Sequence, residues 1–264
     1  MSSPQDELDG TEQPFVSHLI ELRDRLIRAL LAVGVAFGVL MVWPGPAGLY
    51  DILAAPLVAT LPQGATLIAT NVISPFLVPL KITLMAAFLL ALPFVLYQVW
   101  AFVAPGLYTH EKKLVLPLVV SSTLLFLLGV AFCYFFVFGK VFAFIQGFAP
   151  KSITAAPDIE AYLGFVLTMF IAFGASFEVP VAVVLLARMG IVSVQKLREF
   201  RGYFIVVAFI IAAIVTPPDV ISQLALAIPM CLLYEVGIWA ATLFIRHTQA
   251  PEEAASAPAD PGQG

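Results

Sequence analysis

Charged side chains are scarce in this sequence. They make up 11% of its 264 residues, whereas 61% are hydrophobic and the mean hydropathy is +1.00. Soluble domains are about a quarter charged and about half apolar, so this composition excludes an ordinary soluble domain. It predicts an all-α integral membrane protein, because a β-barrel would show short alternating segments in place of long apolar runs.

Cysteine, histidine and enzyme motifs are also rare or missing. Cys133 and Cys231 each lie in an apolar run, and His18, His110 and His247 stand far apart. A disulfide framework and a metal site are therefore not expected, and we interpret both cysteines as small buried residues. The sequence contains no HExxH, GxSxG, GxGxxG or Walker motif, so neither catalysis nor a cofactor is predicted.

The formal net charge of −4 comes from the two ends of the chain. Seven acids lie in a polar head and a Pro/Ala-rich tail: Asp6, Glu7, Asp9, Glu12, Glu252, Glu253 and Asp260. Without them the remaining chain is slightly basic, and nothing points to nucleic acid. We predict a disordered cytoplasmic head (residues 1–14), a membrane domain (15–247) and a disordered cytoplasmic tail (248–264).

Six apolar stretches approach the roughly 20 residues that a helix needs to cross a bilayer. They predict the spans Leu26–Trp43, Phe76–Val103, Leu114–Phe138, Ala161–Ala187, Tyr203–Val215 and Val220–Ile245. Ten basic residues fall on the side of the N-terminus and three on the far side. Basic loops stay in the cytoplasm, so both termini are predicted to be cytoplasmic.

The fifth stretch is short for a membrane span. Its thirteen residues would rise about 20 Å as a helix, against a hydrocarbon core of about 30 Å. The turn TPPD at Thr216–Asp219 predicts a stiff hairpin around which the bilayer thins, unless residues before Tyr203 extend the helix. On the far side, the apolar, proline-rich segment Pro44–Ser74 predicts a structured cap, and Lys81 is expected to reach the interface.

Two acids lie deep in the predicted spans. Glu178 stands ten residues before Arg188 and Glu235 eleven before Arg246, which places each about 15 Å inside the membrane. Such carboxylates are functional candidates, and the alternative is a protonated group that hydrogen-bonds neighbouring helices. Pro180 indicates a kinked helix and favours a functional role for Glu178, whereas both interpretations of Glu235 stay open.

Two further acids lie at the cytoplasmic border. Glu21 precedes Arg25 by four residues, so the two can form an intrahelical pair worth about 0.2–0.5 kcal/mol. Glu111 stands beside Lys112 and can form a surface ion pair of little effect. The aromatic segment before Glu111, which includes Phe102, instead suggests a binding place for guanidinium groups, because these pair with carboxylates and stack on rings.

Five stretches together give the sequence a family resemblance. In chain order they are SHLIELRDRL (17–26), IATNVISPF (68–76), YQVWAFVAPGLYTHEKK (97–113), SFEVPV (176–181) and TPPDVISQ (216–223). The sequence resembles the TatC family, the multi-spanning receptor of the twin-arginine protein translocase, from about Phe15 to Ile245.

The resemblance implies a six-helix bundle with a concave, cupped face and short fifth and sixth helices, in the bacterial cytoplasmic (inner) membrane. It implies that Glu21 and Glu111 contact two adjacent arginines of a signal peptide, and that Arg23 and Phe102 contribute to recognition. Other residues match family positions in the far-side cap, the cavity and the docking region for the single-span partners TatA and TatB: Pro56, Glu178, Thr216, Asp219 and Gln223. Relatives often carry an acid before the second span, whereas Asn71 and Ser74 are neutral.

We therefore expect a receptor that binds twin-arginine signal peptides of folded proteins. It would assemble as a homo-oligomer with TatA- and TatB-like proteins among membrane lipids, and the proton motive force would drive export. One alternative is a proton-coupled transporter of small solutes with Glu178 and Glu235 as its relay. Such carriers usually contain inverted repeats, and the sequences around Pro93 and Pro180, which we expect to interrupt spans two and four, do not correspond. A purely structural scaffold would make Glu21 and Glu111 dispensable.

Overall fold

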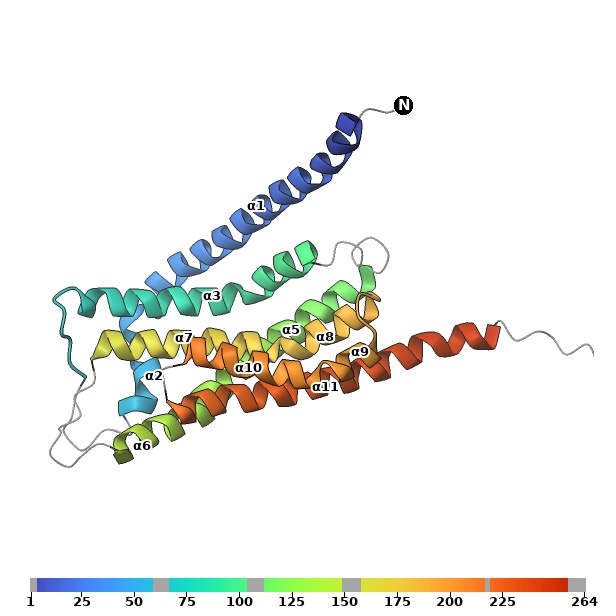
Figure 1. The fold of residues 1–264 in the computed structure, drawn as a ribbon. Coiled ribbons are helices and arrows are strands. Elements are labelled where there is room, and N and C mark those ends of the chain that lie inside the picture. The colour runs from blue at the N-terminus through green and yellow to red at the C-terminus, as the bar shows by residue number, and fades with distance from the viewer. Residues whose placement is uncertain (1–3, 59–66, 104–111, 149–157, 217–218, 256–264) are drawn as a thin grey trace, which may run out of the picture. The chain divides into compact units, whose positions relative to one another are not determined.

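The computed structural model describes the backbone of residues 4–58, 67–103, 112–148, 158–216 and 219–255. In this part of the chain every regular element is a helix (Figure 1). The elements are α1 (Pro4–Val42), α2 (Pro46–Val58), α3 (Ser74–Val103), α5 (Lys112–Phe132), the π-helical turn Cys133–Val137, α6 (Phe138–Phe148), α7 (Ile159–Phe177), α8 (Val179–Arg188), α9 (Val194–Glu199), α10 (Arg201–Val215) and α11 (Val220–Ala255).

The helices confirm the predicted all-α membrane fold. Five described stretches are long and apolar enough to cross a membrane: Val16–Val42, Ser74–Val103, Val115–Phe144, Ile159–Arg188 and Val220–Leu243. The shorter apolar helix α10 takes the place of the predicted fifth span. The first stretch begins ten residues before the predicted Leu26, because the charged residues between them continue the same helix.

Both terminal helices extend past the predicted membrane domain. α1 begins at Pro4 and α11 ends at Ala255, so each enters a segment that we predicted to be disordered. A helix nucleated by an apolar span propagates readily into flanking Glu, Gln and Ala. The domain boundaries at residues 14 and 247 stay a prediction. The sixth helix is also longer than predicted, with 36 residues in α11.

The chain divides into two compact units, residues 1–124 with 151–167 and residues 125–150 with 168–264. In the first unit α1 lies across α3 (Figure 1). Ala36 of α1 packs with Ala87 and Ala91 of α3. Small side chains let the two backbones approach closely, which is how helices associate where lipid removes the hydrophobic drive between them.

The described part of the predicted far-side cap contains the helix α2, which packs against two spans. Leu49 and Leu53 of α2 pack against Val78 of α3 and Leu163 of α7. The Tyr162 hydroxyl also donates a hydrogen bond to the main-chain oxygen of Leu53, at 3.2 Å. These contacts fix α2 against two spans, as its apolar sequence requires.

The two prolines expected to interrupt spans behave differently. α3 continues through Pro93, so the expected interruption of the second span is wrong. A proline removes one backbone donor, and a helix within a bundle can tolerate that loss. The fourth span does break, because α7 ends at Phe177 and α8 begins at Val179, with Pro180 in its first turn.

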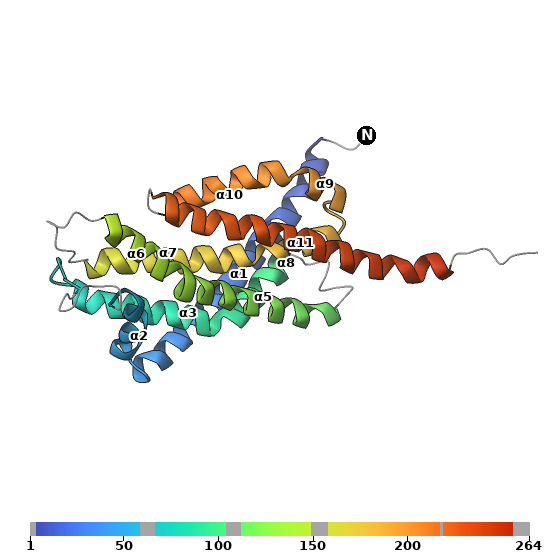
Figure 2. The same cartoon turned by 90° about the horizontal axis from the view of Figure 1, so that it is seen from below.

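In the second unit, α10 and α11 form the predicted hairpin and lie side by side (Figures 1 and 2). α10 begins at Arg201 and has 15 residues, which gives a rise of about 22 Å. Two residues before Tyr203 thus extend the helix, yet it stays shorter than a hydrocarbon core of about 30 Å. The prediction of a short fifth helix is confirmed.

Aromatic packing in the second unit leaves no room at one glycine of α7. A Cβ atom on Gly174 would overlap the ring of Phe126, whereas one on Gly164 of the same helix meets no atom within 4 Å. We expect Gly174→Ala to lower the free energy of unfolding by about 1–3 kcal/mol through overpacking. Gly164→Ala should leave stability unchanged or raise it by up to about 1 kcal/mol. Thermal unfolding in detergent measures both, and equal midpoints for the two variants would contradict this packing.

Candidate functional site

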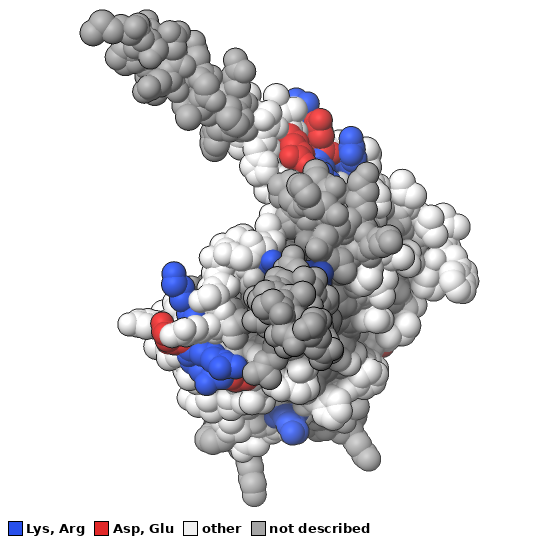
Figure 3. Space-filling model, turned by 90° about the vertical axis from the view of Figure 1, so that its right-hand side faces the viewer, with Lys and Arg blue, Asp and Glu red and all other residues white. Residues whose placement is uncertain are grey.

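The described part of α1 carries mixed acidic and basic side chains beyond its grey N-terminal turns (Figure 3). Glu21 Oε1 accepts hydrogen bonds from Arg25 Nη2 at 2.6 Å and from Arg25 Nε at 2.8 Å. The Arg25 side chain is only 22% exposed, so this pair is less screened than a fully solvated one. The intrahelical pair considered for Glu21 is therefore present.

Two contacts attach this charged cluster to α3. Arg25 Nη1 donates a hydrogen bond to Gln98 Oε1 at 3.4 Å. The His18 and Phe102 rings stack with centroids 4.2 Å apart and planes inclined by 12°, and His18 Nδ1 lies 3.6 Å from Glu21 Oε2. The structure thus brings together Glu21 and Phe102, two of the predicted peptide-binding residues, through His18.

The structure describes only one of the other two predicted peptide-binding residues, Arg23. Arg23 donates to Asp24 Oδ1 from Nη2 at 2.9 Å and from Nε at 3.1 Å, and its side chain is 68% exposed. Glu111 and the side chain of Pro56 lie outside the described residues, although the Pro56 backbone belongs to α2.

All three predicted docking residues make contacts that stabilise the α10–α11 hairpin. Thr216 Oγ1 and Gln223 Nε2 donate to main-chain oxygens of α10, at 2.8 and 3.3 Å. Asp219 Oδ1 accepts a hydrogen bond from the main-chain nitrogen of Ser222 at 2.7 Å, which caps the first turn of α11. These side chains therefore have a structural role besides any role in docking.

The two acids predicted deep in the membrane have different surroundings. Glu178 lies at the junction of α7 and α8 and is partly buried. Glu235 is exposed, and its Oε2 accepts a hydrogen bond from Arg201 Nη2 at 2.7 Å. Because Arg201 is the first residue of α10, Glu235 of α11 lies level with the start of this short helix. Glu235 is thus hydrogen-bonded to a neighbouring helix, as the structural alternative expected, but its partner is an arginine, which that alternative did not include.

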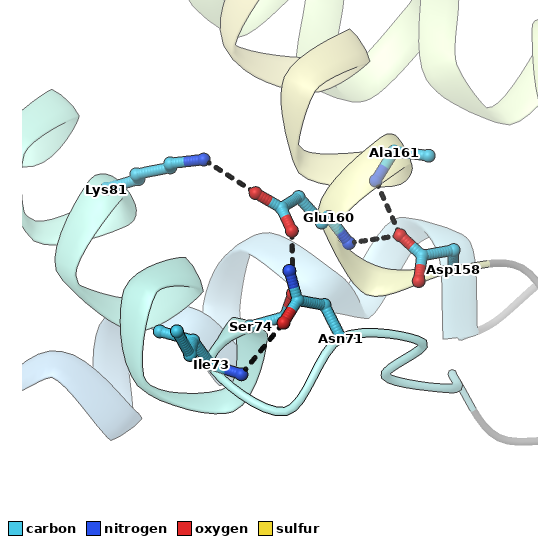
Figure 4. Close-up of polar contacts among 7 residues, drawn as sticks. All are labelled: Asn71, Ile73, Ser74, Lys81, Asp158, Glu160 and Ala161. Atoms are coloured by element: carbon cyan, nitrogen blue, oxygen red, sulfur yellow. Dashed lines mark hydrogen bonds and ion pairs between the residues drawn. The ribbon is translucent and has the colours of Figure 1, made fainter.

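Sequence reasoning missed a polar network that joins the start of α7 to α3 (Figure 4). Glu160 Oε1 lies 3.0 Å from Lys81 Nζ, and Glu160 Oε2 accepts a hydrogen bond from the Ser74 hydroxyl at 2.6 Å. The sequence predicted only that Lys81 reaches the interface. In the structure Lys81 also forms an ion pair with Glu160. The sequence did contain a signal for this pair. Glu160 lies in the first turn of one span, and Lys81 lies near the same end of another.

Asp158 completes this network beside Glu160. Its Oδ1 accepts hydrogen bonds from the main-chain nitrogens of Glu160 and Ala161, both at 2.9 Å. Its Oδ2 accepts two from Thr70, one from the hydroxyl and one from the main-chain nitrogen. These hydrogen bonds, that of the Thr70 hydroxyl foremost, lower the pKa of Asp158 to about 2. The segment before α3 is thereby tied to α7.

The sequence model for "Sec-independent protein translocase protein (TatC)" matches residues 17–229. The chain belongs to the TatC family. It is 50% identical to TatC of Haemophilus influenzae (88% of this chain, 90% of that one) and 49% identical to TatC of Escherichia coli strain K12 (91% and 93%). TatC of Halothiobacillus neapolitanus is 53% identical over 88% of this chain, which spans 63% of that longer relative.

A solved structure supports the same assignment. The crystal structure titled "Twin Arginine Translocase Receptor- TatC" matches with a TM-score of 0.75 and 39% identity, over 86% of this chain and 98% of that one. This TatC-family chain is therefore a multi-pass membrane protein of a translocase family, and the family is not one of enzymes.

The low pKa of Asp158 gives this TatC-family protein a defined dependence on pH. Because the folded pKa, about 2, is below the ordinary value of 3.8, the charged carboxylate stabilises the fold above about pH 4. This contribution is lost as pH falls towards 2. We expect Asp158→Asn to lower the unfolding midpoint above pH 4, and the difference from the unmodified protein to close between pH 4 and pH 2.

Thermal unfolding at graded pH measures this difference. In a Thr70→Val background, Asp158→Asn should have a smaller effect, because the largest contact of the carboxylate is already gone. The low pKa assigned to Asp158 would be contradicted if the unfolding midpoints of the unmodified protein and of Asp158→Asn differed by the same amount at every pH from 6 to 2.

Proposed function

We propose that this chain is the receptor and core subunit of a twin-arginine translocase, and that Glu21 and Glu111 bind the paired arginines of signal peptides. The observation that carries the proposal is the cluster of Glu21, Arg25, His18 and Phe102 on α1 and α3. It combines a carboxylate with aromatic rings, the two groups that guanidinium ions prefer.

The contacts of Arg25 support binding by exchange. A peptide guanidinium that pairs with Glu21 replaces Arg25, which retains its hydrogen-bond acceptor Gln98 Oε1. Because one arginine replaces another, the exchange at Glu21 gains less free energy than pairing with a free carboxylate would. A second carboxylate, that of Glu111, adds a further pair, so both of two adjacent arginines contribute to recognition. Arg23 is exposed, and the ring of Phe102 stacks on His18.

We place the receptor in the bacterial cytoplasmic membrane with both termini inside, on the distribution of its basic residues. The signal peptide's apolar segment inserts along a concave face near Glu178, and the Pro56 cap lies on the far side. TatA- and TatB-like proteins dock at the α10–α11 hairpin around Thr216, Asp219 and Gln223, in a complex with several copies of this chain. The short α10 thins the bilayer there, and the proton motive force drives passage of folded cargo.

The alternative of a proton-coupled solute carrier lacks support at one of its two acids. A relay through Glu178 and Glu235 needs a carboxylate that gains and loses a proton. Glu235 is instead exposed and accepts a hydrogen bond from the guanidinium of Arg201, a contact between helices that a relay residue would have to break.

Charge reversal at Glu111 tests the proposed receptor directly. We expect Glu111→Lys to weaken binding of a twin-arginine peptide at least 30-fold, since removing one partner of a hydrogen-bonded charge pair costs about 2–5 kcal/mol. Photocrosslinking from residue 111 to a radiolabelled precursor and peptide titration measure this effect. Glu199→Lys, which reverses an exposed acid on α9, is the matched control and should bind normally. Unchanged binding by Glu111→Lys in a folded protein would refute the role.

Asp219 allows the structural and docking roles of the hairpin to be separated. Asp219→Ala removes the cap of α11 and should cost about 1 kcal/mol of stability, whereas Asp219→Asn keeps a good capping residue. We expect Asp219→Asn to retain the unfolding midpoint but to reduce crosslinking of a TatB-like partner to α10. If Asp219→Asn crosslinks as the unmodified protein does, the carboxylate has no docking role.

A further inference from the structure

A groove of about 600 Å³ runs between α1 and α3 in the first compact unit. Its lining is almost entirely aliphatic and aromatic, with Leu31, Val35 and Val39 on α1 and Leu90 and Phe94 on α3. Its lining also includes the small residues where the two helices meet, Ala32, Ala36 and Ala91.

One charged side chain lines this groove. Arg28 lies at the end where the apolar stretch of α1 begins. Among the side chains that the structure describes, none forms a hydrogen bond or ion pair with Arg28, and the neighbouring acids Glu21 and Asp24 are paired with Arg25 and Arg23. A guanidinium beside an apolar channel is therefore available to an anion that carries an apolar chain.

The dimensions of the groove fit a lipid chain. Arg28 and Val39 are eleven residues apart, a rise of about 16 Å on a helix, which is close to one leaflet of a hydrocarbon core about 30 Å thick. A signal peptide would bring its own arginines towards Arg28, and like charges repel.

We propose that this groove is a binding site for an anionic phospholipid, with the phosphate on Arg28 and an acyl chain along α1 and α3. Arginine forms paired hydrogen bonds with phosphate oxygens, and basic pockets at helix interfaces bind anionic lipid headgroups. The inference does not depend on the proposed function, because none of the proposed peptide-binding residues lines the groove.

The lipid site is tested with the purified chain in nanodiscs of phosphatidylcholine and phosphatidylglycerol. Native mass spectrometry counts the phosphatidylglycerol molecules that survive release from the disc. We expect Arg28→Gln to reduce retention of phosphatidylglycerol about fivefold, the factor for one basic residue worth about 1 kcal/mol near an anionic headgroup. Lys140→Gln removes an exposed cation on α6 that does not line the groove, and it should retain lipid normally.

Two further measurements keep the proposal falsifiable. Ala32→Phe fills the groove without changing charge and should lower retention of the same lipid, with an unchanged elution volume as the check on folding. A photocrosslinker at Val35 should capture phosphatidylglycerol in nanodiscs, and an excess of twin-arginine peptide should not displace it. Equal retention by Arg28→Gln and Lys140→Gln, or a crosslinker that captures a peptide or another helix in place of lipid, would overturn the proposal.

Discussion

A charged side chain next to lipid needs a partner or a path to the interface, because an unpaired charge at membrane depth costs several kcal/mol. Three ion pairs of this structure meet that constraint along its spans: Glu21 with Arg25, Lys81 with Glu160 and Arg201 with Glu235. Two of them also join separate helices. Lys81–Glu160 ties α3 to α7, and Arg201–Glu235 sets α10 level with α11. Pairs of this kind contribute little in water, yet in a medium of lower dielectric constant they fix which helices are neighbours and at what height.

The same constraint explains how a receptor of this kind can stay folded while it waits for a cationic ligand. Glu21 is already bound by an internal guanidinium, so the carboxylate is neutralised before any peptide arrives. Arg25 keeps Gln98 as a second acceptor, which lowers the cost of releasing Glu21. Recognition then consists of replacing one arginine by another at Glu21 and forming a new ion pair at Glu111. Two adjacent arginines bind more strongly than one, because a single cation occupies only one of the two acids.

Hydropathy predicted most of the fold, since long apolar runs have few alternatives to membrane helices. The short α10, the break near Pro180 and the far-side cap were all evident in the sequence. The partners of the charged residues were not evident in the sequence. Glu160 lies 79 residues from Lys81 and Glu235 lies 34 from Arg201, and nothing local specifies which distant side chain approaches. For the same reason Glu235 could be interpreted as a deep acid when its depth was counted from Arg246 alone. Glu21 and Phe102 were placed together through the family resemblance and not through spacing.

The most direct test of the exchange at Glu21 is a double-mutant cycle in a binding assay. It combines Glu21→Gln in the receptor with replacement of each signal-peptide arginine by glutamine in turn, and Asp24→Asn serves as the control at a neighbouring acid. The exchange account predicts a coupling energy of about 1–3 kcal/mol between Glu21 and one of the two arginines, and none for Asp24. Additive effects at Glu21 with both arginines would show that its carboxylate does not contact the peptide, and would contradict the account.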